Sequence, residues 1–200
     1  MAKFELWYPV KKSIKVHQKF GENLIPMYKE MGMLGHNGWD IQAKDGDPIF
    51  AAHGGIVTFT GEDGSGGLGV VIRTTQKFDY TKEGETKQVY FKSIYWHLAK
   101  GSFKVKPGDS VKAGDLIALA DNTGKSTGSH LHFGIKPVIQ GEADWQWFNL
   151  EQDNGFLGSV DPELHFNSYY AEDAIVVLGI YQKIIEIYKL ILNMVWINKD

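Results

Sequence analysis

Two of the 7 histidines in this chain, His130 and His132, are separated by a single leucine. In a β-strand, residues two apart project from the same face, so both imidazoles would point together while Leu131 and Phe133 face the core. Two imidazoles side by side on a strand form a poor core but a good metal or proton-transfer site. The pair therefore predicts a chemical site rather than packing.

A second candidate is the run His36-Asn-Gly-Trp-Asp40, whose turn-like centre allows the imidazole and the carboxylate to converge on one point. One His, one Asp and a further His make the three-ligand set of a catalytic zinc site, which keeps a fourth position for water. Oxygen and nitrogen ligands without sulfur suit Zn²⁺, whereas Mg²⁺ would need more carboxylates. The chain has no cysteine, which excludes thiol nucleophiles and cysteine-based metal sites.

The elements that position these residues are short strands, because the chain from Ser13 to Pro137 shows little helical periodicity. A polar excursion from Gln76 to Lys87 predicts a hairpin tip, and Glu62 to Gly67 predicts a loop. The predicted strands are rich in β-branched and aromatic residues and bounded by Gly or Asp. They are Pro48–Ala52, Gly55–Thr60, Leu68–Arg73, Gln88–Phe91 and Leu116–Ala120.

A small internal repeat follows, in which Val105-Lys-Pro-Gly-Asp109 is succeeded by Val111-Lys-Ala-Gly-Asp115. Each Gly-Asp predicts a tight turn and each Val a return to a strand. We interpret the repeat as a strand–turn–strand corner without chemistry of its own.

Taken together, these motifs resemble the signatures of the lysostaphin-like (LytM, M23) zinc endopeptidases. The resemblance rests on the run from His36 to Val57, on Tyr95-Trp-His-Leu98, on the Val-Lys-x-Gly-Asp repeat and on Asn122 to Phe133, in the family's order. It covers Phe20 to Ile135, and the combination is highly specific.

The resemblance implies zinc held by His36, Asp40 and His132, with His97 and His130 beside it as catalytic histidines. It also implies a mainly β fold with an antiparallel core of the lysostaphin-like barrel-sandwich kind (a duplicated hybrid motif) and the site in an open groove. The implied activity is hydrolysis of peptide bonds in bacterial peptidoglycan, at stem-peptide crosslinks or bridges, by zinc-activated water with two assisting histidines. Gly134 stands where the family often has Glu.

Three alternatives belong to other classes. A histidine phosphocarrier would use neighbouring histidines but has no need of Asp40 as a ligand. A biotinyl or lipoyl carrier would resemble the Gly-Asp repeat but needs a hairpin-tip lysine that is missing here. A non-catalytic LytM-like activator or binding module would have lost ligands, whereas this chain retains all five positions. A measurement of bound zinc distinguishes the peptidase and the activator from the phosphocarrier. An assay of hydrolysis then distinguishes the peptidase from the activator.

Several other residues that bear chemistry are interpreted as structural. His53 lies at a strand-to-turn position. Neither His17 nor His165 has a second potential ligand or catalytic residue at a spacing that would indicate a site. Trp39 either walls the groove or packs in the core. Trp145 and Trp147 either stack on substrate at the groove edge or cap the fold.

Three segments are expected: a catalytic domain over residues 1–140 with its motif core at 20–135, a loop-rich extension over 141–170, and a C-terminal helix within 171–200. The helix is predicted from Ala174 to Ile197, where Lys183, Glu186 and Lys189 share one face of an apolar stretch. Such charges would each cost about 2.5–3.5 kcal/mol in a bilayer, so the helix is amphipathic rather than transmembrane. It would dock on the domain, lie on a membrane surface or pair with a second copy, and pairing is favoured because basic residues are few.

Net charge is −3 and the isoelectric point about 6.2, which gives no basic field for nucleic acid. The first residues lack the apolar run of a secretory signal. The expected place of action is the cell wall, extracellular or periplasmic. A phage-borne protein such as a lysin, or one released by lysis, would reach it without a signal.

Overall fold

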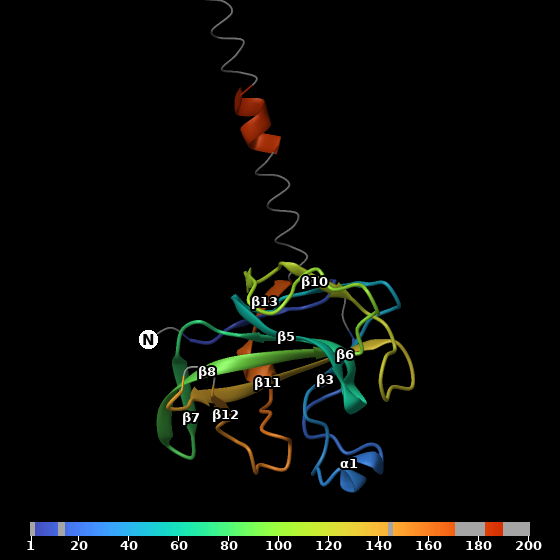
Figure 1. Cartoon of the computed structure of the whole chain (residues 1–200), viewed down its shortest axis with the longest axis vertical. Coiled ribbons are helices and arrows are strands. Elements are labelled where there is room, and N and C mark those ends of the chain that lie inside the picture. The colour runs from blue at the N-terminus through green and yellow to red at the C-terminus, as the bar shows by residue number, and fades with distance from the viewer. Residues whose placement is uncertain (1–2, 12–14, 144–145, 171–182, 190–200) are drawn as a thin grey trace, which may run out of the picture.

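The protein is mainly β in a computed structural model that describes residues 3–11, 15–143, 146–170 and 183–189 (Figure 1). Helical elements before residue 171 are short: α1 (Met27–Glu30) and two 3₁₀ turns, η1 (Gly64–Gly66) and η2 (Glu163–His165). The strands are β1 (Leu6–Tyr8), β2 (Val16–Gln18), β3 (Trp39–Gln42), β4 (Pro48–Phe50), β5 (Gly55–Asp63), β6 (Gly67–Arg73), β7 (Phe78–Lys82), β8 (Glu85–Trp96), β9 (Ser110–Val111), β10 (Leu116–Leu119), β11 (His130–Gln140), β12 (Trp147–Asn149) and β13 (Phe166–Tyr170).

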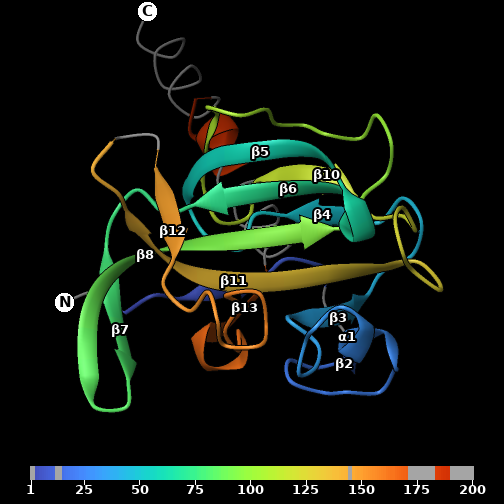
Figure 2. The ribbon, with the colours of Figure 1, turned by 60° about the horizontal axis from the view of Figure 1, so that its bottom comes forward.

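A nine-stranded antiparallel sheet dominates the fold, in the order β2-β3-β11-β8-β6-β5-β9, with β12 paired to β11 and β7 paired to β8. Figure 2 shows the long strands β11, β8 and β6 side by side at its centre. Two small sheets accompany it: β10 with β4, antiparallel, and β1 with β13, parallel. The central strands are those that carry the histidine motifs.

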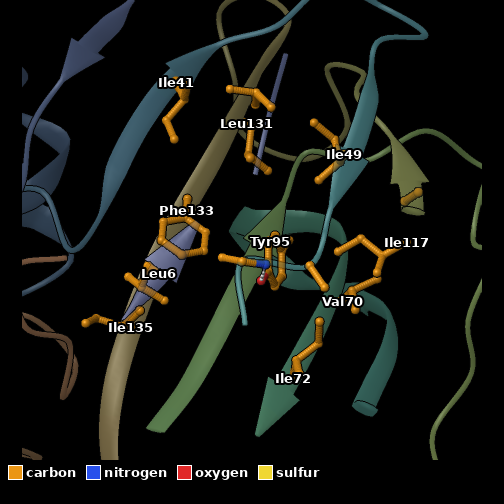
Figure 3. Close-up of a cluster of buried hydrophobic side chains, with 14 of the residues drawn as sticks. Leu6, Ile41, Ile49, Val70, Ile72, Tyr95, Ile117, Leu131, Phe133 and Ile135 are labelled. Carbon is orange, nitrogen blue, oxygen red and sulfur yellow. Dashed lines mark hydrogen bonds between the residues drawn. The ribbon is translucent and has the colours of Figure 1, made fainter. Parts of the chain in front are cut away.

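The hydrophobic core lies between one face of the large sheet and the small sheets (Figure 3). From the large sheet come Leu131, Phe133 and Tyr95, and from the small sheets Ile49 and Ile117; each has 0% of its surface exposed. Burying one such side chain contributes roughly 1.5–3 kcal/mol. This face fixes the register of β11, because a slip by one residue would move every core side chain to the other face.

Alternation along β11 then decides what the opposite face carries. Leu131, Phe133 and Ile135 are fully buried in the core. The residues that alternate with them along the strand therefore project from the other face, and these include His130 and His132. The predicted separation of apolar and imidazole side chains along this strand is confirmed.

The hairpin tip and the two Gly-Asp turns predicted from turn residues are also confirmed, whereas the loop predicted from Glu62 to Gly67 is shorter, because β5 runs to Asp63 and β6 begins at Gly67 with η1 between them. The polar excursion forms the β7–β8 hairpin, which turns at Glu83 and Gly84. In the repeat, Asp109 accepts a hydrogen bond from the backbone N–H of Lys106 at 2.9 Å, and Asp115 accepts one from that of Lys112 at 2.7 Å. Each Asp closes its own turn, and Val111 enters β9, whereas Val105 lies outside the strands.

The sequence reading did not anticipate α1 or the strands beyond Pro137. Within the expected loop-rich extension, β12 pairs with the end of β11, and β13 pairs with β1 near the N-terminus. Residues 183–189 are helical, and the remainder of the helix predicted from Ala174 to Ile197 lies outside the described residues, as do its docking and pairing. The three-segment division stays a prediction. In the described part of the chain, no helix combines the length and the apolarity needed to cross a membrane.

Candidate active site

Three side chains from two adjacent strands and the loop before them converge on one point. Asp40 on β3 lies directly opposite His132 on β11, and His36 precedes β3. His36 Nε2 is 2.9 Å from His132 Nδ1 and 3.1 Å from Asp40 Oδ1, and His132 Nδ1 is 3.1 Å from the same oxygen. These three atoms form a group that could hold a metal ion.

The donor chemistry of this group fits a metal. His36 Nδ1 donates a hydrogen bond to the backbone carbonyl of Lys19 at 3.3 Å, which leaves Nε2 with its lone pair aimed at the centre. Atoms bound to one tetrahedral zinc at about 2.0–2.2 Å lie roughly 3.3–3.6 Å apart, a few tenths of an ångström wider than the separations here. Three electron-rich atoms this close require a proton or a cation between them.

The electrostatics keep Asp40 ionised. Burial alone would raise the pKa of its carboxyl, but the close contacts of its oxygen with the rings of His130, His132 and His36 lower that pKa far below its usual value. Burial lowers the pKa of His132, which favours the neutral imidazole. An ionised carboxylate and a neutral imidazole are the protonation states that metal ligands need.

His97 and His130 lie next to this group, with their ring centroids 4.6 Å apart. His97 Nδ1 donates to the carbonyl of Thr123 at 2.6 Å, and His130 Nδ1 donates to the carbonyl of Gly128 at 2.8 Å. Each Nε2 is thereby left for other partners, and that of His130 lies 3.4 Å from Asp40 Oδ1. Both rings present the same nitrogen for proton transfer.

The backbone at His97 is left-handed, with φ of +64°. A non-glycine residue in this region costs of order 1–3 kcal/mol and persists where the surroundings hold it, often at functional sites. Burial lowers the pKa of His97 to about 4, so the ring is neutral at neutral pH. For His130 burial is again the largest single influence and lowers the pKa, but the hydrogen bond with Asp40, the charge of Asp40 and the hydrogen bond to the Gly128 carbonyl together outweigh it and raise the pKa.

Two glycines allow the loop that carries His36 to approach β11. A Cβ on Gly38 would lie 2.5 Å from the carbonyl oxygen of Phe133 and 3.0 Å from the His132 ring. A Cβ on Gly134 would lie 3.0 Å from the carbonyl oxygen of Asn37. The missing side chain at position 134, where the sequence departs from the family's usual Glu, accommodates this loop.

The structure thus brings together all five residues singled out from the sequence: His36, Asp40, His97, His130 and His132. The others lie elsewhere. Trp39 is 4% exposed and its ring contacts that of Phe166 in a tilted arrangement, so it packs in the core. His53 is buried beside Phe4, and His165 donates to the Phe4 carbonyl.

Sequence reasoning missed the groups that orient the histidines. Thr123 and Gly128 lie in the Asn122–Phe133 motif, but their role is played by backbone carbonyls, which leave no side-chain signal. Lys19, whose backbone carbonyl orients His36, directly follows β2 and belongs to none of the sequence motifs. An open hollow of about 560 Å³ is lined by Lys15, His17, Gln42, Ala43, Lys44, Asp45 and Ser129.

Comparison with known proteins places this geometry in a family. The model of peptidase family M23 matches residues 34–144, a stretch that contains all five site residues. The chain belongs to peptidase family M23. The M23 signature residues noted in the sequence therefore coincide with the convergent site in the fold.

Individual M23 proteins are similar to this chain. Peptidoglycan DD-endopeptidase ShyA of Vibrio cholerae is 32% identical over 135 residues, which is 67% of this chain and 27% of that protein. A crystal structure of a zinc-containing peptidase from Vibrio cholerae matches with a TM-score of 0.53 and 29% identity, covering 68% of this chain and 37% of that one. The catalytic domain of lysostaphin from Staphylococcus simulans shares the fold, with a TM-score of 0.54 and 24% identity over 75% of this chain and 90% of that one. The chain spans about a quarter of the length of the curated relatives it matches.

Proposed function

We propose that this M23 protein is a zinc-dependent endopeptidase that hydrolyses peptide bonds of bacterial peptidoglycan. The observation that carries the proposal is the convergence of His36 Nε2, Asp40 Oδ1 and His132 Nδ1 within 2.9–3.1 Å of one another, beside the paired rings of His97 and His130. The site combines a ligand set with proton-transfer groups, which is the combination that metal-assisted hydrolysis needs.

Zinc is the ion that the donor set favours. His36, Asp40 and His132 would hold it through two nitrogens and one oxygen, and the chain has no cysteine to supply a thiolate. When bound, Zn²⁺ supplies a water molecule that ionises near pH 7, and the ion itself polarises a carbonyl group. The similarity to a zinc-containing peptidase supports this choice over other divalent ions.

The two remaining histidines divide the proton transfers. His97 is neutral with a free Nε2, so it accepts the proton of the attacking water. His130, whose pKa is raised, keeps its proton and donates a hydrogen bond from Nε2 to the oxygen that becomes negative at the scissile carbonyl. The proton held at His97 then passes to the leaving amine, so one peptide bond and one water give a carboxylate and an amine.

The substrate follows from the relatives. ShyA is named a peptidoglycan DD-endopeptidase, and a protein of Neisseria meningitidis, 29% identical over 119 residues, is named a DD-carboxypeptidase/endopeptidase. Their names support a wall peptide as the substrate of this chain and the bacterial cell wall as its place of action. A phage-borne or lysis-released origin, self-association and a membrane-surface role for residues 174–197 stay predictions.

A non-catalytic M23 binding module is the strongest rival. The same ligand set would serve such a module, but His97 held in a strained left-handed conformation would have no purpose there. A phosphocarrier would have no use for the ionised Asp40 that contacts three imidazoles. Both features favour hydrolysis.

The test is digestion of purified cell walls of several peptidoglycan chemotypes, with the released peptides identified by mass. The wild-type protein should release new amine and carboxylate termini at one type of bond. His97→Ala and His130→Ala should each lower the rate by about 10² or more, the usual scale for lost acid–base catalysis. Metal content and circular dichroism of the variants serve as controls. Intact walls with metal-loaded protein would favour the binding module.

A further inference from the structure

Three cationic side chains stand in one row across the three central strands. Arg73 on β6 lies directly opposite Lys92 on β8, and Lys92 lies directly opposite Lys136 on β11. Figure 2 shows these strands side by side. Directly opposite residues have Cβ atoms about 4.5–5.5 Å apart, so three positive charges occupy a span of roughly 10 Å. We refer to Arg73, Lys92 and Lys136 as the cation row.

The cation row has no compensating partner within the described residues, because none of its three members forms an ion pair there. Burial lowers the pKa of both lysines; the charge of Arg73 lowers that of Lys92 further, and Lys92 does the same to Lys136. Asp63 is near enough to raise the Lys136 pKa, but less than burial lowers it. Like charges directly opposite one another destabilise a sheet, so the row is costly without a bound anion.

Arg73 is also held in a fixed orientation. Its guanidinium carbon lies 3.5 Å from the centre of the Trp147 ring, and Trp147 in turn meets Tyr90 edge to face at 5.1 Å. Its Nε is buried and has no hydrogen-bond partner among the described residues. Stacking covers one face of the guanidinium and Nε is buried, which leaves the two terminal Nη groups to bind a carboxylate in a bidentate manner.

The cation row shares a face of the sheet with the metal ligands. His132 and Lys136 are four residues apart on β11, both on the face opposite the core, and four strand residues span about 13 Å. An extended peptide covers the same distance in about four residues. In an extended peptide that lies along this face with its scissile bond at the histidines, the residue about four positions away is therefore within reach of the row.

We propose that Arg73, Lys92 and Lys136 bind a carboxylate of the wall peptide, about four extended residues from the bond that is cut. The inference rests on the proposed function, because it takes the bound peptide from that reaction. It makes the cation row a specificity site: peptides with a free carboxylate at this distance are preferred over peptides in which it is amidated.

The test compares two soluble peptidoglycan crosslink peptides, one with free carboxylates and one with the same carboxylates amidated. Binding is measured calorimetrically in the full chain with His97→Ala, so that the peptide is not consumed. Lys92→Met and Lys136→Met keep the aliphatic stem and remove the charge; Lys104→Met, at an exposed position outside the row, is the matched control. Each row variant should weaken binding of the free-carboxylate peptide at least about 10-fold and leave the amidated peptide unchanged.

Two further readouts separate binding from structure. Without peptide, Lys92→Met should melt at a higher temperature than the parent, because the repulsion is relieved. With His97 restored, the row variants should raise KM for the free-carboxylate peptide and leave kcat unchanged. Equal affinity for both peptides in the parent, an equal loss for both peptides in the variants, or a lower melting temperature for Lys92→Met would overturn the proposal.

Inorganic phosphate is titrated in parallel. Phosphate that binds the row tightly while the two peptides bind alike would contradict a carboxylate site. A wild-type protein that binds the free-carboxylate peptide preferentially but cuts neither peptide would remove the proposed function and keep the cation row. A wild-type protein that cuts both peptides with equal KM would keep the proposed function and contradict the role of the cation row.

Discussion

Thr123 orients His97, and replacing it by Val should separate the geometry of catalysis from the binding of metal. The Thr123 hydroxyl donates to the carbonyl of Leu98 at 2.8 Å and accepts from the N–H of Leu68 at 3.1 Å. The backbone carbonyl of the same residue accepts from His97 Nδ1 at 2.6 Å. The hydroxyl therefore anchors the carbonyl that fixes which nitrogen of His97 faces the site.

Thr123→Val keeps the shape of the side chain and removes both hydrogen bonds. An unpaired buried backbone group costs about 1–3 kcal/mol, and Leu98 is fully buried whereas Leu68 is half-buried, so the sum is roughly 3 kcal/mol. For a chain of this size that loss lowers the melting temperature by about 6–12 °C. Misplacing His97 should lower kcat about tenfold or more, with KM little changed.

The assay is hydrolysis of a soluble wall peptide well below the melting temperature, with metal content measured on the same samples. Thr123→Ser is the matched control, since it keeps the hydroxyl and should restore both kcat and stability. Thr123→Val should keep its metal, because no ligand contacts the changed atom. The reasoning is refuted if Thr123→Val retains the wild-type kcat, or if Thr123→Ser is as impaired as Thr123→Val.

Three further perturbations test other parts of the structure. A Cβ on Gly69 would lie 1.7 Å from the Trp96 ring, so Gly69→Ala should lower the melting temperature sharply, and an unchanged melting curve would contradict this packing. Burial lowers the pKa of His53 from 6.5 to about 4. Between these two values His53 is protonated in the unfolded chain but neutral in the folded chain, so the free energy of unfolding falls as the pH drops from about 6.5 to about 4. Urea unfolding at about pH 7.5 and pH 5 should show a loss roughly 2 kcal/mol larger in wild type than in His53→Gln, and parallel losses would refute it. Truncation after Tyr170 should retain metal and peptide hydrolysis while reducing the apparent mass in solution from an oligomer to a monomer; a chain that fails to fold would show that residues 171–200 belong to the core.

The sequence was informative wherever a single strand or turn decides the outcome. The period of two along residues 130–136 places Leu131 and Phe133 in the core and the two histidines on the opposite face. Gly-Asp pairs predict turns for the same local reason, because the Asp side chain closes its own turn.

What the sequence could not show depends on register between strands and on backbone atoms. The alignment of Arg73, Lys92 and Lys136 is set by how three strands pair, and the core on the other face fixes that pairing. The carbonyls that orient the histidines have no side-chain signal, and the left-handed backbone at His97 is a conformation that only a few per cent of non-glycine residues adopt. These features emerge only from the assembled sheet.

The most direct test of the account is the zinc content of five single variants, measured by elemental analysis of protein purified without added metal. Wild type is expected to hold one zinc per chain. His36→Ala, Asp40→Ala and His132→Ala should lose it, whereas His97→Ala and His130→Ala should retain it and lose hydrolysis. Zinc that stays in His36→Ala or Asp40→Ala, or that leaves His130→Ala while His132→Ala keeps it, would contradict the assignment of ligands and catalytic histidines.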